Sequence, residues 1–200
     1  HMKTFGRVLT AMITSFNEDG SVNIENTVAI AEHLLNHGSD GLVVCGTTGE
    51  NPTISRESKT ALFKAIAKAC GDKGTIIANV GSNDTKGSVD FVKEVSAIPG
   101  IDGLLVVVPY YNKPNQQGQY LHFKSIAEAT TLPIMVYNVP GRVGTGIFPA
   151  ILARLHKEYP HICAIKEASG NLMIASEIKR LMPGEDFMVY SGDDGLTLPI

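Results

Sequence analysis

A lysine at the end of a short apolar run is the residue of this sequence best placed to do chemistry. Lys166 closes the run ICAIK at residues 162–166, which has the hydrophobicity of a buried strand. Burial disfavours an ammonium group and lowers its pKa, and a neutral amine can attack a ketone carbon to form a Schiff base. The alternative is that the ammonium group reaches solvent or pairs with Glu167. The position therefore suggests imine chemistry, with an ordinary strand-end lysine as the competing interpretation.

Tyr137 ends the preceding apolar run, LPIMVYN at residues 132–138. Neighbouring strands lie about 4.8 Å apart, so side chains at the same level of two such strands can meet. The Tyr137 hydroxyl is then a candidate proton shuttle for imine formation at Lys166. An interior aromatic residue with a satisfied hydroxyl is the alternative.

Two further polar segments follow apolar runs and could bind a carboxylate. The turn at residues 46–49 offers the hydroxyls of Thr47 and Thr48 together with backbone N–H groups, although Gly/Thr turns are common. Arg142 follows Pro140 and Gly141 in a short loop, where a guanidinium could hold a carboxylate with two hydrogen bonds. A surface arginine is the alternative.

Adjacent tyrosines and a cysteine are weaker candidates. Tyr110 and Tyr111 lie in a loop between two prolines, as residues of an interface or a site lid often do, although either could simply cover a rim. Cys45 precedes the threonine turn and could be a nucleophile, but a small buried apolar residue is the favoured interpretation.

The elements that must position these residues alternate regularly along the chain. Continuous apolar runs predict strands at 8–14, 41–46, 75–80, 103–109, 132–138, 162–166 and 187–192. Helical spacing predicts helices at 24–37, 55–70, 85–97, 116–130, 147–157 and 171–182. This alternation is typical of either an open doubly wound sheet or a (β/α)8 barrel. The barrel is favoured, because the polar segments all follow strands and no G-x-G-x-x-G follows the first strand.

The number of elements falls short of a complete barrel. A (β/α)8 barrel needs eight strands and typically about 250 residues, whereas this sequence has 200 and ends after its seventh predicted strand. We therefore expect a single barrel domain over residues 1–200, shown in truncated form. The leading His1 and Met2 are expected to be a cloning scar.

Composition narrows the classes of partner. The formal net charge is −3 and the isoelectric point is near 6.1, which argues against nucleic acid or an anionic membrane as the main partner. No apolar stretch reaches the ~20 residues needed to span a bilayer. Three widely spaced cysteines fit reduced thiols in the cytoplasm. No metal ligand set is evident.

Four motifs in order, GLVVCGTTGE, PYYNKP, YNVPGR and ICAIKEASGN, resemble the dihydrodipicolinate synthase family over essentially the whole sequence. That family lies in the superfamily of pyruvate-dependent class I aldolases, which includes N-acetylneuraminate lyase. The resemblance implies a (β/α)8 barrel enzyme that condenses pyruvate with L-aspartate 4-semialdehyde in lysine and diaminopimelate biosynthesis. It implies no cofactor and a homotetramer built as a dimer of dimers. GTTGE, together with Arg142, favours the synthase over the sugar-acid lyases.

The resemblance also implies a role for each matching residue. Lys166 would form the Schiff base with pyruvate, and Thr47, Tyr137 and Tyr111 would relay protons, with Tyr111 lent by a neighbouring subunit. Sites that would bind substrates or an inhibitor complete the set: Thr48 and Gly192 for pyruvate, Arg142 for the carboxylate of the second substrate, and Asn83 with Tyr110 for lysine at a dimer cleft.

Gly87 stands where lysine-inhibited members tend to carry a glutamate, so weak or absent inhibition is expected. Two other functions stay open. One is a different pyruvate aldolase, acting on a sugar acid or a hydroxy-oxo acid. The other is a non-catalytic protein built on an incomplete barrel.

Overall fold

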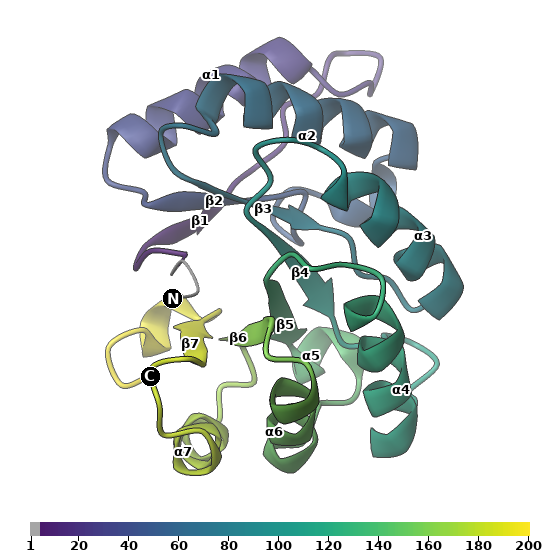
Figure 1. The fold of residues 1–200 in the computed structure, drawn as a ribbon. Helices are drawn as coiled ribbons and strands as arrows, with labels where there is room; N and C mark the ends of the chain where they lie inside the picture. The colour runs from purple at the N-terminus through teal and green to yellow at the C-terminus, as the bar shows by residue number, and fades with distance from the viewer. Residues whose placement is uncertain (1–4) are drawn as a thin grey trace. The chain divides into compact units, whose positions relative to one another are not determined.

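The computed structural model describes residues 5–200, so the predicted cloning scar at His1 and Met2 lies outside the described residues. Strands and helices alternate along the chain, as the colour gradient of Figure 1 shows. The strands are β1 (Leu9–Ala11), β2 (Gly41–Val44), β3 (Thr75–Asn79), β4 (Gly103–Val107), β5 (Ile134–Asn138), β6 (Ile162–Glu167) and β7 (Met188–Ser191). The α-helices are α1 (Ile24–Asn36), α2 (Arg56–Cys70), α3 (Thr85–Ser96), α4 (Gln116–Ala127), α5 (Pro140–Val143), α6 (Pro149–Glu158) and α7 (Leu172–Leu181). Two 3₁₀ turns, η1 (Asn51–Thr53) and η2 (Asp194–Leu196), follow β2 and β7.

The strands follow one another in chain order, from β1 to β7, in one sheet of the described residues. The pairs β1–β2, β2–β3, β3–β4, β5–β6 and β6–β7 are all parallel. A doubly wound sheet would instead reverse its strand order at a switch point. Sequential parallel order is that of a (β/α)8 barrel, as the sequence predicts.

The chain divides into two compact units. The first comprises His1–Asn79 and Glu94–Leu105. Its strands β2 and β3 are buried along their whole length, and α1 packs against α2 beside them. Continuous burial explains why these strands read as uninterrupted apolar runs in the sequence. The prediction of a single domain over residues 1–200 stays a prediction.

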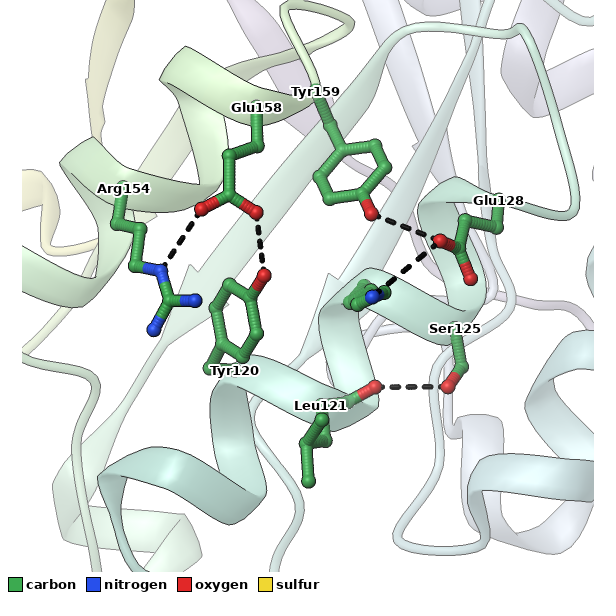
Figure 2. Close-up of polar contacts among 8 residues, drawn as sticks. Tyr120, Leu121, Ser125, Glu128, Arg154, Glu158 and Tyr159 are labelled. Atoms are coloured by element: carbon green, nitrogen blue, oxygen red, sulfur yellow. Dashed lines mark hydrogen bonds and ion pairs between the residues drawn. The ribbon is translucent and has the colours of Figure 1, made fainter.

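The second unit comprises Val80–Lys93 and Val106–Ile200. It contains β6, the strand that includes Lys166 near its end. Within it, α6 packs against both α4 and α7. Figure 2 shows the polar contacts between α4 and the end of α6: Tyr120 donates to Glu158, and Tyr159 donates to Glu128 over 2.9 Å. The guanidinium carbon of Arg154 lies 3.8 Å from the centre of the Tyr120 ring. These contacts fix α4 against α6.

The predicted helix starts are largely correct, because local capping residues specify them. Ser55 caps α2, its hydroxyl accepting from the backbone N–H of Ser58 over 3.1 Å. Asn115 caps α4 in the same way, with Gly118 as donor at 2.8 Å. The structure places α6 at Pro149–Glu158, where a helix at 147–157 is predicted.

Several elements differ from their predicted bounds, and β1, α4 and α5 are the clearest cases. β1 is only Leu9–Ala11, although the run at 8–14 is apolar, and Val8 and Ile13 are each 54% exposed. α4 ends at Ala127, not at residue 130. α5 is absent from the predicted elements, because Pro140-Gly141 resembles a turn, whereas proline also fits the first residue of a helix. None of the helices in residues 5–200 combines the length and the hydropathy that crossing a bilayer requires.

Candidate functional site

Lys166 and Tyr137 are direct neighbours on paired strands, as the sequence predicts. In the register of β5 and β6, Tyr137 pairs with Lys166, and on the other side Lys166 pairs with Tyr190 of β7. The Lys166 Nζ atom lies 4.6 Å from the centre of the Tyr137 ring. Tyr137 is buried, so the amine rests against an aromatic face and not in open solvent.

The surroundings of Lys166 favour its neutral form. Burial lowers the pKa of Lys166 below its ordinary value of 10.5. The negative charge of Asp194 opposes this shift, and the positive charge of Arg142 adds to it. A larger fraction of this amine is therefore uncharged near neutral pH than of an exposed lysine, which is the state that attacks a carbonyl carbon.

Gly192 follows β7 and lies against the Lys166 side chain. A Cβ added to Gly192 would stand 3.0 Å from Cγ and 3.1 Å from Cε of Lys166, and 2.8 Å from the Cβ of Ala168. The Gly192 backbone N–H donates to the Glu167 carbonyl over 2.8 Å. The absence of a side chain here is what leaves room for the extended lysine stem.

Arg142 lies on α5, a single helical turn over Pro140–Val143 that is terminated by Gly144, whose φ is 84°. The side chain of Arg142 is exposed. Gly144 in turn touches the neighbouring loop, since a Cβ on it would lie 2.8 Å from Cε of Lys113. The positive charge of Arg142 lowers the pKa of Lys166, and the exposed guanidinium is accessible to an anionic ligand.

Thr47 and Thr48 belong to the first unit, in the turn that follows β2. Both side chains are exposed. Cys45 at the start of the turn has a positive φ of 54°, and the side-chain amide of Asn79 donates to its carbonyl over 2.8 Å. The hydroxyl of Thr14 supports the other end by donating to the Gly49 carbonyl over 2.7 Å. The threonines thus stand on a turn held from β3 and from the segment after β1.

Cys45 itself is fully buried, and burial raises the pKa of its thiol to about 12. A thiol in that state is not a nucleophile, so Cys45 is the small apolar residue that the sequence favours.

Asn83, Tyr110 and Tyr111 come together in the second unit. The Asn83 side-chain amide donates to the Tyr110 carbonyl over 3.2 Å, and Asn112 donates back to the Asn83 carbonyl over 3.4 Å. Tyr111 is 89% exposed and has a positive φ of 71°. Its ring therefore projects away from this chain. Among the described residues, no three His, Cys, Asp or Glu side chains are grouped to hold a metal ion.

Comparison with known proteins assigns the chain to a family. Residues 4–200 match the family described as "Dihydrodipicolinate synthetase family". The chain belongs to the dihydrodipicolinate synthetase family. A 4-hydroxy-tetrahydrodipicolinate synthase of Desulforamulus reducens is 51% identical over 196 residues, which are 98% of this chain and 66% of the relative.

Solved structures of the dihydrodipicolinate synthetase family have the same fold. A dihydrodipicolinate synthase of Bacillus anthracis superposes with a TM-score of 0.95 at 44% identity, covering 99% of this chain and 67% of that one. The enzyme of Cyanidioschyzon merolae, solved with lysine bound, gives a TM-score of 0.94 at 44% identity, covering 98% and 66%. The predicted fold class, a (β/α)8 barrel seen through its seventh strand, is confirmed. The chain spans about two thirds of the length of these relatives.

Two buried residues of this family member are absent from the sequence-based candidates. Asn138 and Glu167 follow Tyr137 and Lys166 and pair with each other in the strand register. The Glu167 carboxylate accepts hydrogen bonds from the Asn138 side-chain amide over 2.9 Å and from the Ser169 backbone N–H over 2.8 Å. These contacts correct the alternative in which Glu167 pairs with Lys166. A carboxylate and an amide at matching positions of adjacent strand ends were the available signal.

Proposed function

We propose that the protein carrying this sequence catalyses the 4-hydroxy-tetrahydrodipicolinate synthase reaction, the condensation of pyruvate with L-aspartate 4-semialdehyde. One observation carries the proposal. Lys166 is a largely buried amine with a lowered pKa, resting on the Tyr137 ring and facing a residue without a side chain. Membership of the dihydrodipicolinate synthetase family supports the choice of substrates.

The reaction would begin at the Lys166 amine. The neutral amine attacks the ketone carbon of pyruvate, and the carbinolamine loses water to give an imine. Loss of a proton from the methyl carbon gives an enamine, whose carbon attacks the aldehyde and forms the new carbon–carbon bond. The amino group from the second substrate then attacks the imine carbon, which closes the ring and releases Lys166. The protonated imine accepts the electron pair in these steps, so the proposal includes no metal and no organic cofactor.

Other residues would bind the substrates and move protons. Tyr137, Thr47 and Tyr111 would relay the protons needed to lose water. Thr48, with the backbone beside it, would hold the pyruvate carboxylate, next to Gly192. Arg142, which is exposed on a one-turn helix, would hold the carboxylate of the semialdehyde with two hydrogen bonds.

The proposal extends to assembly and place in the cell. Tyr111 would be lent to the site by a second subunit of a dimer, and two dimers would form the tetramer. The near-complete exposure of Tyr111 within this chain supports a role in another subunit. The protein would work in the cytoplasm, in lysine and diaminopimelate biosynthesis. Asn83 and Tyr110 would face lysine at a dimer cleft. Inhibition by lysine would be weak or absent, because Gly87 stands where inhibited members tend to carry a glutamate.

Trapping with borohydride tests the central step. The full-length protein is incubated with pyruvate, reduced with sodium borohydride and analysed by mass spectrometry of its peptides. A reduced pyruvate adduct on Lys166 is expected, and none with Lys166→Ala. Without an adduct on Lys166 the Schiff-base mechanism is wrong.

A coupled assay with pyruvate and L-aspartate 4-semialdehyde tests the substrates. Turnover is expected there. Cleavage of a sugar acid to pyruvate, with no condensation, would instead identify the protein as a different pyruvate aldolase.

A further inference from the structure

Two successive residue pairs stand at the ends of β5 and β6. Tyr137 pairs with Lys166 in the strand register, and the next pair is Asn138 with Glu167. Successive side chains of a strand point to opposite faces of the sheet. The second pair therefore faces away from the amine, directly behind the residues proposed to do the chemistry.

This second pair is a buried polar contact with matched partners. Asn138 is 0% exposed and Glu167 1% exposed, so neither can exchange its partner for water. Burying a carboxylate is costly unless hydrogen-bond donors face it. The Glu167 carboxylate has two, because one oxygen accepts from the Asn138 amide and the other from the Ser169 backbone N–H.

The oxygen of the Asn138 side-chain amide contacts the segment that follows Arg142. This oxygen accepts from the Ile147 backbone N–H over 3.2 Å. The Asn138 backbone carbonyl also accepts from the N–H of Ala168, two residues after Lys166, over 2.9 Å. Because a donor faces the oxygen and an acceptor faces the nitrogen, the orientation of this amide is fixed.

The segment after Arg142 packs closely against Asn138. A Cβ added to Gly146 would lie 3.0 Å from the Asn138 side-chain oxygen. The same segment is fastened from α4, where the Gln116 side chain donates to the Gly146 carbonyl and accepts from the Phe148 N–H, both over 2.8 Å. Asn138 thus joins a segment anchored on α4 to the strand end that carries the lysine.

We propose that Asn138 and Glu167 are a positioning pair that sets where the Lys166 strand end lies relative to the Arg142 turn. The inference rests on the proposed function, in which Lys166 carries the enamine and Arg142 holds the second substrate. The distance between the enamine carbon and the aldehyde then depends on a buried amide–carboxylate contact that touches neither substrate. Misplacement by about 1 Å can slow a reaction by about a hundredfold.

A polarity swap tests the pair. Asn138→Asp places two buried carboxylates face to face. Glu167→Gln leaves one oxygen for two donors, so a donor must face a donor whichever way either amide turns. In the double variant, the new amide at position 167 would donate to the new carboxylate at position 138 and accept from the Ser169 N–H. That carboxylate would still accept from the Ile147 N–H, so the swap restores every hydrogen bond with no change in net charge.

Each single variant is expected to lower kcat/KM for the condensation about ten- to a hundredfold, with a raised KM for the semialdehyde. The double variant is expected to return to within about fivefold of the unmodified protein, as coupled residues do. Ile165→Val, a buried change on the same strand, is the control for lost stability alone. Glu167→Gln should slow condensation more than Ile165→Val does at an equal drop in melting temperature.

Two results would overturn the positioning pair. One is a kcat/KM for Glu167→Gln within about twofold of that of the unmodified protein. The other is a kcat/KM for the double variant no higher than that of the less active single variant. If Asn138→Asp fails to fold, Glu167→Gln and the double variant decide the question alone. Hydrogen exchange at the Ser169 and Ile147 backbone amides measures the integrity of the pair in the absence of substrate. Faster exchange is expected in Glu167→Gln. Failure of the proposed function is distinguished by the absence of a borohydride-trapped adduct in the unmodified protein.

Discussion

At the scale of single residues, the properties of Lys166 come from its neighbours. Burial disfavours its charge, the Tyr137 ring supports the amine at 4.6 Å, and Gly192 leaves space beside its stem. Each of these conditions can be changed separately by substitution. Two experiments can therefore test the reactivity of the amine. One examines its protonation, and the other examines the space beside the lysine side chain.

The pH dependence of trapping tests the charge. The rate of adduct formation with pyruvate is expected to rise with pH as Lys166 loses its proton, with the midpoint of the rise below 10.5, the ordinary pKa of a lysine, because burial lowers the pKa. Asp194→Asn removes a charge that raises the pKa, so its profile should level off at lower pH. Arg142→Gln removes a charge that lowers it, so its profile should level off at higher pH. A midpoint at or above 10.5 in the unmodified protein would contradict the expectation.

Gly192→Ala tests the space beside the lysine. The new Cβ would fall 3.0 Å from Cγ of Lys166 and 2.8 Å from Cβ of Ala168, so the lysine stem must move. Trapping of pyruvate on Lys166 is expected to fall about tenfold or more, because a displaced nucleophile loses its attack geometry. Gly141→Ala is the matched control, since a Cβ there meets nothing within 4 Å. Equal trapping in the two variants, measured by peptide mass spectrometry, would count against a role for Gly192.

At the scale of elements, the helices hold the loops that carry the site. The first turn of α4 supplies Gln116, which binds the segment after Arg142 by two hydrogen bonds. The contacts of Tyr120 with Glu158 and Arg154 fix the middle of the same helix to α6 (Figure 2). The position of the segment after Arg142 therefore depends on how α4 begins, and so on its capping residue Asn115.

Asn115→Ala tests that helix start. The Asn115 side chain accepts from the Gly118 N–H over 2.8 Å, and its loss leaves that donor without a partner from the chain. The free energy of unfolding is expected to fall by about 1 kcal/mol, measured by urea denaturation. Asn115→Asp keeps an acceptor at the helix N-terminus and should cost much less. Equal losses in the two variants would show that the cap hydrogen bond is not the cause.

Buried strands and capped helices could be predicted from the sequence, because their signals are local. The runs that become β2 and β3 are apolar at nearly every residue, and the capping serine of α2 is adjacent to its helix. α5 and the Asn138–Glu167 contact could not be predicted in this way. Proline followed by glycine is compatible with a turn or a helix start, and a glutamate after a strand-end lysine resembles a solvated residue. The contact becomes evident from the register of β5 and β6, in which Asn138 pairs with Glu167.

At the scale of the whole molecule, Tyr111 combines two features that contacts within its own chain do not explain. It is 89% exposed, although large aromatic side chains are usually well buried, and its φ of 71° is uncommon for a residue with a side chain. Residues with a side chain that are held at positive φ cluster at active sites and ligand-binding regions. Under the proposed function this ring enters the site of a second subunit, which makes the working site a property of the dimer.

Mixing two inactive variants tests that dependence. Tyr111→Phe keeps Lys166 but lacks the relay hydroxyl, whereas Lys166→Ala keeps Tyr111 but lacks the amine. In a hybrid dimer, the Tyr111→Phe subunit would contain the lysine and receive an intact tyrosine from its partner. Random reassociation of equal amounts makes half of the dimers hybrid with one complete site each, so roughly a quarter of all sites should recover. The condensation rate is measured after joint unfolding and refolding, with each variant refolded alone as the control. If Tyr111 instead serves its own subunit, no mixture can contain a complete site, and the rate will stay at the average of the two variants.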